Sequence, residues 1–443
     1  MTRQIANWGN YPVMESDVLS FNSVTGLQQL VDSHSQMIPR GNGRCYGDAS
    51  LAPTTLLTLR LDKILSFDTG AGVFECESGL TLDEVLRVIV PRGWFLPVTP
   101  GTKFITVGGA MASNVHGKNH HLDGPFSNHV VEMDVLTSSD GLITCSPDRH
   151  PDLFEATAGG MGLTGVITRI KFRLKKIETS YIAQKQVKAG GLEEILQLFD
   201  RYHHYTYSVA WIDCIKQGKG FGRSILILGE HAGVSQLDPD KARSPLHIPS
   251  KKGIVFPFNL PSFVLNKFTI RAFNALYYGK NLKKEMDNIV HYEPFFYPLD
   301  AILHWNRGYG RKGFVQYQFV VPTDKKEGLI EILNRISRKG MGSFLAVLKK
   351  FGTHPSMISF PIEGYTLALD FPVRNGLFEF LDELDKIVLE HGGRIYLSKD
   401  ARMKPPVFWG AYPRAEEFRT VVNKYNPGYT FRSHLSDRLF ITT

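Results

Sequence analysis

The sequence of 443 residues has few cysteines and no long apolar run. The four cysteines, Cys45, Cys76, Cys145 and Cys214, lie far apart without C-x-x-C spacing, which indicates neither a zinc ribbon nor a disulfide framework. Nowhere do about 18 apolar residues follow one another, and the N-terminus has no apolar core of a secretory signal, so we expect neither a transmembrane helix nor a Sec leader. These absences favour a cytoplasmic location and leave open an export route that uses no such leader.

Acidic residues are also in deficit, since 51 lysines and arginines face 43 aspartates and glutamates. The excess suggests an anionic partner such as a phosphate, a lipid headgroup or a nucleic acid. It is densest in segment 241–284, which has nine basic and no acidic residues, interleaved with aromatic ones, and whose prolines argue against one regular helix throughout. This basic segment fits the anionic surface of a bilayer, and a solvated surface loop is the alternative. Because no RNA- or DNA-binding motif accompanies it, we do not expect nucleic acid as a partner.

Glycine, by contrast, is concentrated in segments 40–48, 100–121 and 159–165. Glycine lets the backbone approach a ligand closely, and three such segments imply one large cofactor. The third, Gly160-Met161-Gly162-Leu163-Thr164-Gly165, matches the dinucleotide motif G-x-G-x-x-G, but we expect a helix before it and a strand after it, the reverse of a Rossmann fold. Amides that donate to a phosphate-bearing ligand explain the segment better, and a tight turn alone is the alternative.

The second glycine-rich segment ends in a group of imidazoles, His116, His120 and His121, with His129 shortly after. Histidines four apart on a helix can share a metal, but Gly117 and Asn119 disfavour a helix, and no carboxylate or thiolate has ligand spacing. We therefore predict no metal site.

Hydrophobic patterns predict an α+β fold of two parts. A capping box at Thr81 predicts a helix that ends before Gly93, and residues 166–174 alternate as a half-buried strand does. Later strands at 314–321, 343–348 and 366–371, with helices at 327–336 and 377–389, indicate helices on a largely antiparallel sheet. The expected division is a first domain of residues 1–179 plus 394–443 and a second domain of residues 180–393, with the basic segment as an insertion.

The glycine-rich segments resemble those of vanillyl-alcohol-oxidase (PCMH-type) flavoenzymes, in which FAD lies between two α+β subdomains. A more specific resemblance, to the decaprenylphosphoryl-β-D-ribose 2′-oxidase family, extends over nearly the whole chain. Its motifs are Arg40-Gly-Asn-Gly-Arg-Cys-Tyr-Gly-Asp48, Pro100-Gly-Thr102, Val107-Gly-Gly-Ala110, His116-Gly-Lys-Asn-His-His121, Gly162-Leu-Thr-Gly165, Thr206-Tyr-Ser208, Ala210-Trp211, Trp305-Asn-Arg307, Gln316-Tyr-Gln-Phe319 and Lys399-Asp400.

This resemblance implies an FAD site and a sugar site. The residues expected to hold FAD are Arg40, Gly41, Asn42, Gly43, Arg44, Cys45, Tyr46, Pro100, Gly101, Thr102, Val107, Gly108, Ala112, Asn114, His116, Gly117, Asn119, Gly160, Gly162, Gly165 and Ile167. The residues expected to bind substrate are Lys118, Tyr297, Gln316, Gln318 and Trp211, and the catalytic residues are Lys399, Tyr46 and His116.

The family oxidises the ribose 2′-hydroxyl of a polyprenyl phosphosugar and passes hydride to FAD. A separate NAD(P)H-dependent keto-reductase then completes epimerisation to the arabinose form used in cell-wall arabinan. The implied protein is peripheral on the inner membrane, with a lipid-linked phosphosugar as substrate. Lys399 is the first candidate to polarise the hydroxyl or accept its proton, with Tyr46 and His116 assisting.

The sequence departs from its relatives at two places. Many flavoenzymes of this type attach FAD covalently to a histidine in the first glycine loop. Here Cys45 stands there, so we expect non-covalent FAD, with a thioether as the alternative. Where mycobacterial-type enzymes have an Asn-x-Cys pair over the flavin, we match Ala346 and Leu348. The competing enzymatic hypothesis is an alditol or aldonolactone oxidase that acts on soluble sugars.

Overall fold

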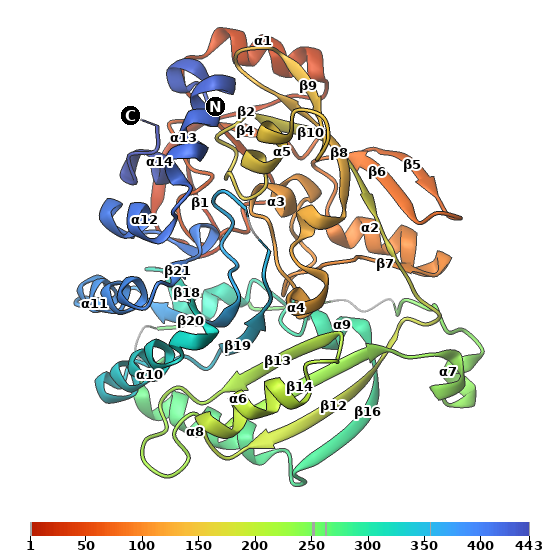
Figure 1. Ribbon diagram of the computed structural model, residues 1–443, viewed down its shortest axis with the longest axis vertical. Helices are drawn as coiled ribbons and strands as arrows, with labels where there is room; N and C mark the ends of the chain where they lie inside the picture. The colour runs from red at the N-terminus through yellow and green to blue at the C-terminus, as the bar shows by residue number, and fades with distance from the viewer. Residues whose placement is uncertain (1, 250–252, 262–263, 355, 443) are drawn as a thin grey trace.

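The computed structural model describes residues 2–249, 253–261, 264–354 and 356–442 (Figure 1). Its first part contains two sheets, with strand orders β1-β2-β4-β3 and β5-β6-β10-β8-β9. The strands are β1 (Thr2–Ala6), β2 (Val13–Ser20), β3 (Ile38–Arg40), β4 (Thr54–Leu57), β5 (Ile64–Asp68), β6 (Val73–Glu77), β8 (Val130–Leu136), β9 (Leu142–Cys145) and β10 (Val166–Arg173), and a short pair is formed by β7 (Trp94–Phe95) and β11 (Lys175–Lys176).

The helices of this part are α1 (Val24–Ser33), α2 (Leu82–Ile89), α3 (Val107–Ala112), α4 (His120–Asp123) and α5 (Pro151–Thr157). Helix α2 begins as its sequence predicts: the backbone N–H of Thr81 donates to the Glu84 carboxylate at 2.8 Å, and the Glu84 N–H donates back to the Thr81 hydroxyl at 3.3 Å. Segment 159–165 lies between α5 and β10, which confirms the inverted order that argued against a Rossmann fold.

The second part is built on an eight-stranded sheet of order β16-β12-β14-β13-β19-β20-β18-β21. Every pairing in it is antiparallel, which confirms the predicted α+β fold. Its strands are β12 (Tyr181–Ala189), β13 (Tyr207–Ile212), β14 (Ser224–His231), β16 (Glu285–His291), β18 (Phe314–Pro322), β19 (Ala346–Phe351), β20 (Gly364–Pro372) and β21 (Arg394–Ile395).

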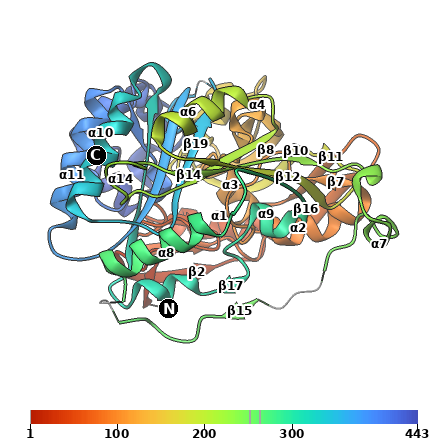
Figure 2. The ribbon, with the colours of Figure 1, turned by 90° about the horizontal axis from the view of Figure 1, so that it is seen from below.

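Helices α6 (Leu192–Arg201), α10 (Glu327–Lys339) and α11 (Leu377–Glu390) lie together on one side of this sheet, and α8 (Lys267–Gly279) lies on the other (Figure 2). The remaining elements are α7 (Pro239–Ala242), α9 (Tyr292–Phe296), α12 (Pro405–Ala411), α13 (Ala415–Tyr425), α14 (His434–Arg438) and a parallel pair of short strands, β15 (Ile254–Val255) and β17 (Ile302–Leu303). No helix within the described ranges is long and apolar enough to cross a membrane.

The C-terminal helices pack against the N-terminal sheets (Figure 1). A bridge joins Met37 to Phe431, and buried Asp48 pairs with Arg438 at 2.8 Å and with His434 at 2.9 Å. These contacts hold the last helices beside the first glycine loop.

One local expectation is corrected. Strand β19 begins at Ala346 rather than at residue 343, and the hydroxyl of Ser343 donates to Leu345 O at 2.9 Å just before it. The basic segment is not one regular helix throughout, as expected: it contains the 13-residue helix α8, whose N-cap is Asn266, and the short strand β15. Residues 250–252 and 262–263 of that segment lie outside the described residues. Within segment 100–121, helix α3 begins at a Thr106 cap.

Candidate functional site

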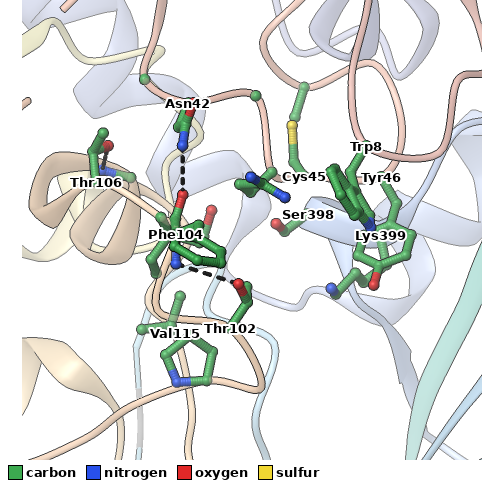
Figure 3. Close-up of a pocket in the computed structure, with 18 of the residues that line it drawn as sticks. Trp8, Asn42, Cys45, Tyr46, Thr102, Phe104, Thr106, Val115, Ser398 and Lys399 are labelled. Carbon is green, nitrogen blue, oxygen red and sulfur yellow. Dashed lines mark hydrogen bonds between the residues drawn. The ribbon is translucent and has the colours of Figure 1, made fainter. Parts of the chain in front are cut away.

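A large cavity lies where the glycine loops of the first part face the eight-stranded sheet (Figure 3). Most of the residues predicted for cofactor, substrate or catalysis line it: Arg40, Gly41, Asn42, Gly43, Arg44, Cys45, Tyr46, Pro100, Gly101, Thr102, Gly108, Ala112, His116, Gly162, Gly165, Ile167, Gln316, Gln318 and Lys399. The fold therefore gathers residues from five stretches of sequence around one space.

Eight of the predicted residues do not line the cavity, namely Val107, Asn114, Gly117, Lys118, Asn119, Gly160, Trp211 and Tyr297. Most of their polar groups bond within the protein. Asn119 donates to Pro97 O at 2.7 Å, the hydroxyl of Tyr297 bonds that of Thr99 at 2.6 Å, and Trp211 donates to Phe344 O at 3.1 Å. In this structure these side chains support the loops and strands around the cavity.

The glycine loops are packed so tightly that larger residues would not fit. A Cβ at Gly41 would lie 2.3 Å from the Thr106 hydroxyl oxygen, and one at Gly165, whose φ is +146°, would lie 2.4 Å from Leu136 O. Gly101 is the exception, because a Cβ there would meet no protein atom within 4 Å. Gly101 therefore faces open space inside the cavity, where a ligand can lie against the backbone.

Some residues that line the same space have unpaired donors. Among the described residues, the backbone N–H groups of Asn42, Gly43 and Arg44 have no hydrogen-bond acceptor. The hydroxyl of Ser78, which also lines the cavity, is buried without a partner within the described chain. Successive free N–H groups form an anion-binding concavity, so this end of the cavity suits a phosphate-bearing ligand.

The opposite end holds Lys399, whose ammonium nitrogen lies 3.7 Å from the centre of the Tyr46 ring (Figure 3). Burial lowers the pKa of Lys399 to about 7, although the nearby Asp370 carboxylate acts in the opposite direction. Burial raises the pKa of Tyr46 well above its usual value, so its phenol stays protonated. Lys399 can therefore exchange a proton near neutral pH, whereas Tyr46 can only donate a hydrogen bond.

Asp370 is buried near Lys399 and accepts hydrogen bonds from Gln316 at 2.6 Å and from Tyr309 at 3.1 Å. Burial raises its pKa to about 6, with these two hydrogen bonds and Lys399 opposing the rise. The carboxylate is therefore ionised at neutral pH and fixes the orientation of Gln316 at the cavity.

His116 is buried, and burial lowers its pKa well below the usual value, so the imidazole is neutral. The Gln318 amide donates to His116 Nε2 at 3.0 Å, which assigns the proton to Nδ1. Nδ1 has no acceptor among the described residues. Such a buried, unpaired donor indicates that a polar ligand group belongs beside it.

Three neighbouring strands form the floor of the cavity, and their side chains alternate. Leu345, just before β19, and Val347 and Lys349 within it line the cavity, whereas Ala346 and Leu348 point away into the core. The expectation that Ala346 and Leu348 face the flavin is therefore wrong. On β20 the lining residues are Ala368 and Asp370, and on β18 they are Gln316 and Gln318, which pair across the sheet with Asp370 and Ala368 respectively.

Comparison with known proteins supports a cofactor site in this cavity. A family described as an FAD binding domain matches residues 25–146. The chain is 36% identical to decaprenylphosphoryl-β-D-ribose oxidase of Mycolicibacterium smegmatis over 453 residues, which cover 99% of this chain and 97% of that protein. The chain belongs to the decaprenylphosphoryl-β-D-ribose oxidase family. Its membership and its FAD binding domain make it an FAD-dependent oxidoreductase that acts on a sugar alcohol.

Other relatives of this decaprenylphosphoryl-β-D-ribose oxidase family member are more distant. An uncharacterized protein in the mprA 5′ region of Streptomyces coelicolor is 31% identical over 370 residues, which cover 81% of this chain and all (100%) of that protein. Cytokinin dehydrogenase 6 of Oryza sativa subsp. japonica is 34% identical over 146 residues, covering 31% of this chain and 28% of that protein.

The cavity of this oxidase family member fits FAD. The free N–H groups of Asn42, Gly43 and Arg44 suit a pyrophosphate, and the open space at Gly101 admits a flat ligand close to the backbone. Cys45 lines the cavity with its sulfur 3.4 Å from the Ser50 hydroxyl, and burial raises the pKa of its thiol. A protonated thiol is a poor nucleophile, which favours non-covalent binding.

The sequence interpretation missed three charged residues that line this cavity, Asp300, Lys349 and Asp370. Asp370 falls in the predicted strand 366–371, two positions from Ala368, so period-2 alternation could have placed both on one face. Lys349 lies just beyond the predicted strand 343–348, because β19 extends to Phe351.

Proposed function

We propose that the protein oxidises the 2′-hydroxyl of a polyprenylphosphoryl-β-D-ribose to the 2′-keto sugar, the first half of epimerisation to an arabinose donor. The observation that carries this proposal is Lys399, a lysine with a pKa near neutrality that lies against Tyr46 at one end of a cavity whose other end suits FAD. Oxidation of an alcohol requires removal of a hydroxyl proton and of a hydride, and the site offers a base where the sugar would lie.

In the proposed reaction, Lys399 takes the hydroxyl proton. Its neutral amine form is available near pH 7 because burial disfavours the ammonium. Tyr46 donates a hydrogen bond to the sugar oxygen, since its phenol stays protonated. His116 offers Nδ1–H as a second donor to the sugar.

FAD held by the glycine loops would supply the acceptor for the hydride of the sugar carbon. The ketone then needs a separate NAD(P)H-dependent reductase to complete the epimerisation. We further propose that residues 1–179 and 394–443 form the FAD-binding domain and residues 180–393 the substrate domain, so that the sugar approaches from the eight-stranded sheet.

Anaerobic mixing of the holoenzyme with farnesylphosphoryl-β-D-ribose, a short-chain substrate, tests the proposal. The flavin absorbance should bleach, and the sugar product should be lighter by two hydrogen atoms. Oxidation of free polyols with release of peroxide, and no bleaching by the phosphosugar, would instead support an alditol oxidase.

The basic segment is proposed to dock the protein on an anionic membrane as a peripheral protein of the inner membrane. Helix α8 anchors one face to the protein through buried Ile270 and through Tyr277, whose ring lies 4.8 Å from that of Trp211. Its other face exposes Phe268 and Leu276, which are 68% and 75% accessible. Basic residues flank these apolar ones, as the surface of an anionic bilayer requires.

The docking surface lies next to the cavity. The N–H of Ile254 donates to Ala301 O at 2.9 Å, and β17, which β15 pairs with, contributes Ile302 and Leu303 to the cavity lining. Figure 2 shows α8, β15 and β17 on one side of the molecule. A polyprenyl phosphate can therefore stay in the bilayer while its sugar enters the cavity.

Co-sedimentation with vesicles that contain anionic lipid tests the docking surface. Changing both Phe268 and Leu276 to Glu should reduce the bound fraction strongly, because two apolar contacts are lost and two negative charges face the lipid. Leu65→Glu is the matched control, since Leu65 is exposed on β5. Undiminished binding of the double variant would contradict the assignment.

A further inference from the structure

Lys349 is a charged group of the cavity that the proposed oxidation does not use. It projects from β19 into the cavity, on the same strand face as Val347. Within the described residues it forms no ion pair and no hydrogen bond. Its nearest aromatic contact is loose, with the nitrogen 5.8 Å from the centre of the Phe351 ring.

The titratable neighbours of Lys349 are mostly bases. Lys118, His116 and Lys399 all lie close enough for its charge to lower their pKa values. Among the described residues, Asp370 is the carboxylate that lines this floor, and it acts on Lys399. Burial lowers the pKa of Lys349 itself to about 8, so it is still mostly protonated at pH 7.

Enclosing an ammonium group without an anion is unfavourable, because the group loses its hydration and gains nothing in return. Lys399 lines the same cavity, and its charged form makes that cost larger. A ligand anion beside Lys349 would remove it, since a charge-assisted hydrogen bond to phosphate replaces the lost water.

We propose that the ammonium group of Lys349 binds the phosphodiester of the substrate and thereby selects phosphorylated over neutral sugars. This inference rests on the proposed function for the identity of the sugar, but not for the presence of the anion site. Lys349 acts on binding, and Lys399 acts on the proton.

A pair of substrates measures this selectivity. The wild type and Lys349→Gln are compared by anaerobic flavin reduction with farnesylphosphoryl-β-D-ribose and with farnesyl β-D-riboside, which lacks the phosphate. The half-saturating concentration of the phosphosugar should rise about 10- to 100-fold in the variant, the limiting rate should stay nearly unchanged, and the neutral riboside should be unaffected. Lys349→Arg should recover most of the binding.

Lys350→Gln is the matched control. Lys350 is the next residue on β19, points to the other face and pairs with Asp200 at 2.6 Å. The Lys350→Gln variant removes the same charge outside the cavity and should behave as the wild type. A fall in the limiting rate of Lys349→Gln with unchanged half-saturation, or an equal loss with both substrates, would overturn the proposal.

Binding of farnesyl phosphate, followed by the perturbed flavin spectrum of the holoenzyme, separates the two proposals. Saturable binding in the wild type that is lost in Lys349→Gln supports the anion site even if no phosphosugar is oxidised, in which case only the proposed function fails. Equal binding in both proteins refutes the anion site whatever the activity.

Discussion

Lys399 and Tyr46 form a close pair, with the ammonium nitrogen 3.7 Å from the centre of the phenol ring. The ring stabilises the charged form of the lysine by a cation–π contact, whereas burial destabilises it. The balance leaves Lys399 as a base whose pKa is close to neutral pH. Its partner Tyr46 keeps its proton at that pH.

Replacing Lys399 with Met tests this base. The variant should keep its FAD, because the change leaves the glycine loops intact, and should reduce flavin with the phosphosugar about 10²- to 10⁴-fold more slowly. Stopped-flow absorbance measures the rate. Reduction at the wild-type rate would exclude Lys399 as the base.

The limiting rate of flavin reduction should depend on pH through the same residue. A base must be unprotonated, so the rate should rise about tenfold per pH unit below pH 7 and level off above it, in line with a Lys399 pKa of about 7. The groups that face Lys399 are Tyr46, Asp370, Cys45 and Lys349. In Asp370→Asn the midpoint should move to lower pH, because a negative charge that favours the ammonium is removed.

Gly101→Ala should lower the content of bound FAD without unfolding the protein. A Cβ at Gly101 meets no protein atom within 4 Å, so the fold itself tolerates it, whereas FAD lying there would not. The ratio of flavin to protein absorbance measures the loss. Gly279→Ala, which also meets nothing but lies at the end of α8, should keep full FAD content.

Arg438→Met should destabilise the protein. Asp48 is fully buried and pairs with Arg438 and His434, and these partners hold its pKa below the usual value although burial raises it. Removal of Arg438 leaves a buried carboxylate poorly compensated, which costs about 3 to 5 kcal/mol and is measurable by urea denaturation. The exposed pair of Arg335 and Glu331 is the control, and Arg335→Met should change little.

The ion pair of Asp48 and Arg438 also predicts how the stability of the protein depends on pH. Because the pKa of Asp48 is lower in the folded protein than in the unfolded chain, its contribution to stability is present above the unfolded-state pKa and is lost as the pH falls through the folded-state pKa. The loss of stability below pH 4 should therefore be smaller in Asp48→Asn than in the wild type.

Local signals in the sequence were sufficient for much of this site. The Thr81 capping box, the alternation of residues 166–174 and the glycines that must approach other atoms closely each depend on neighbouring residues alone. Such features are read from short stretches. Residues of all three glycine-rich segments line the cavity, as does Lys399, which was expected from the family resemblance.

Non-local packing explains what the sequence could not supply. Whether Ala346 or Val347 faces the cavity depends on which face of β19 packs against the core, and that is decided by distant segments. Lys118 and Trp211 carry recognisable motifs, yet the fold directs Lys118 to Phe296 O and Trp211 to Phe344 O. Helix α8 was obscured because its stabilising contacts, such as that of Asn274 with Asp213, span distant segments.

The alternating floor of the cavity limits how this enzyme can diversify. On the paired strands β19, β20 and β18, every second residue lines the cavity, and Lys349, Ala368 and Gln318 are one example from each strand. The residues between the lining ones fill the core. A single-residue insertion or deletion in any of these strands would exchange the two sets, putting lysine into the core and leucine into the cavity. New substrate preferences can therefore arise here by substitution, but not by changes in strand length.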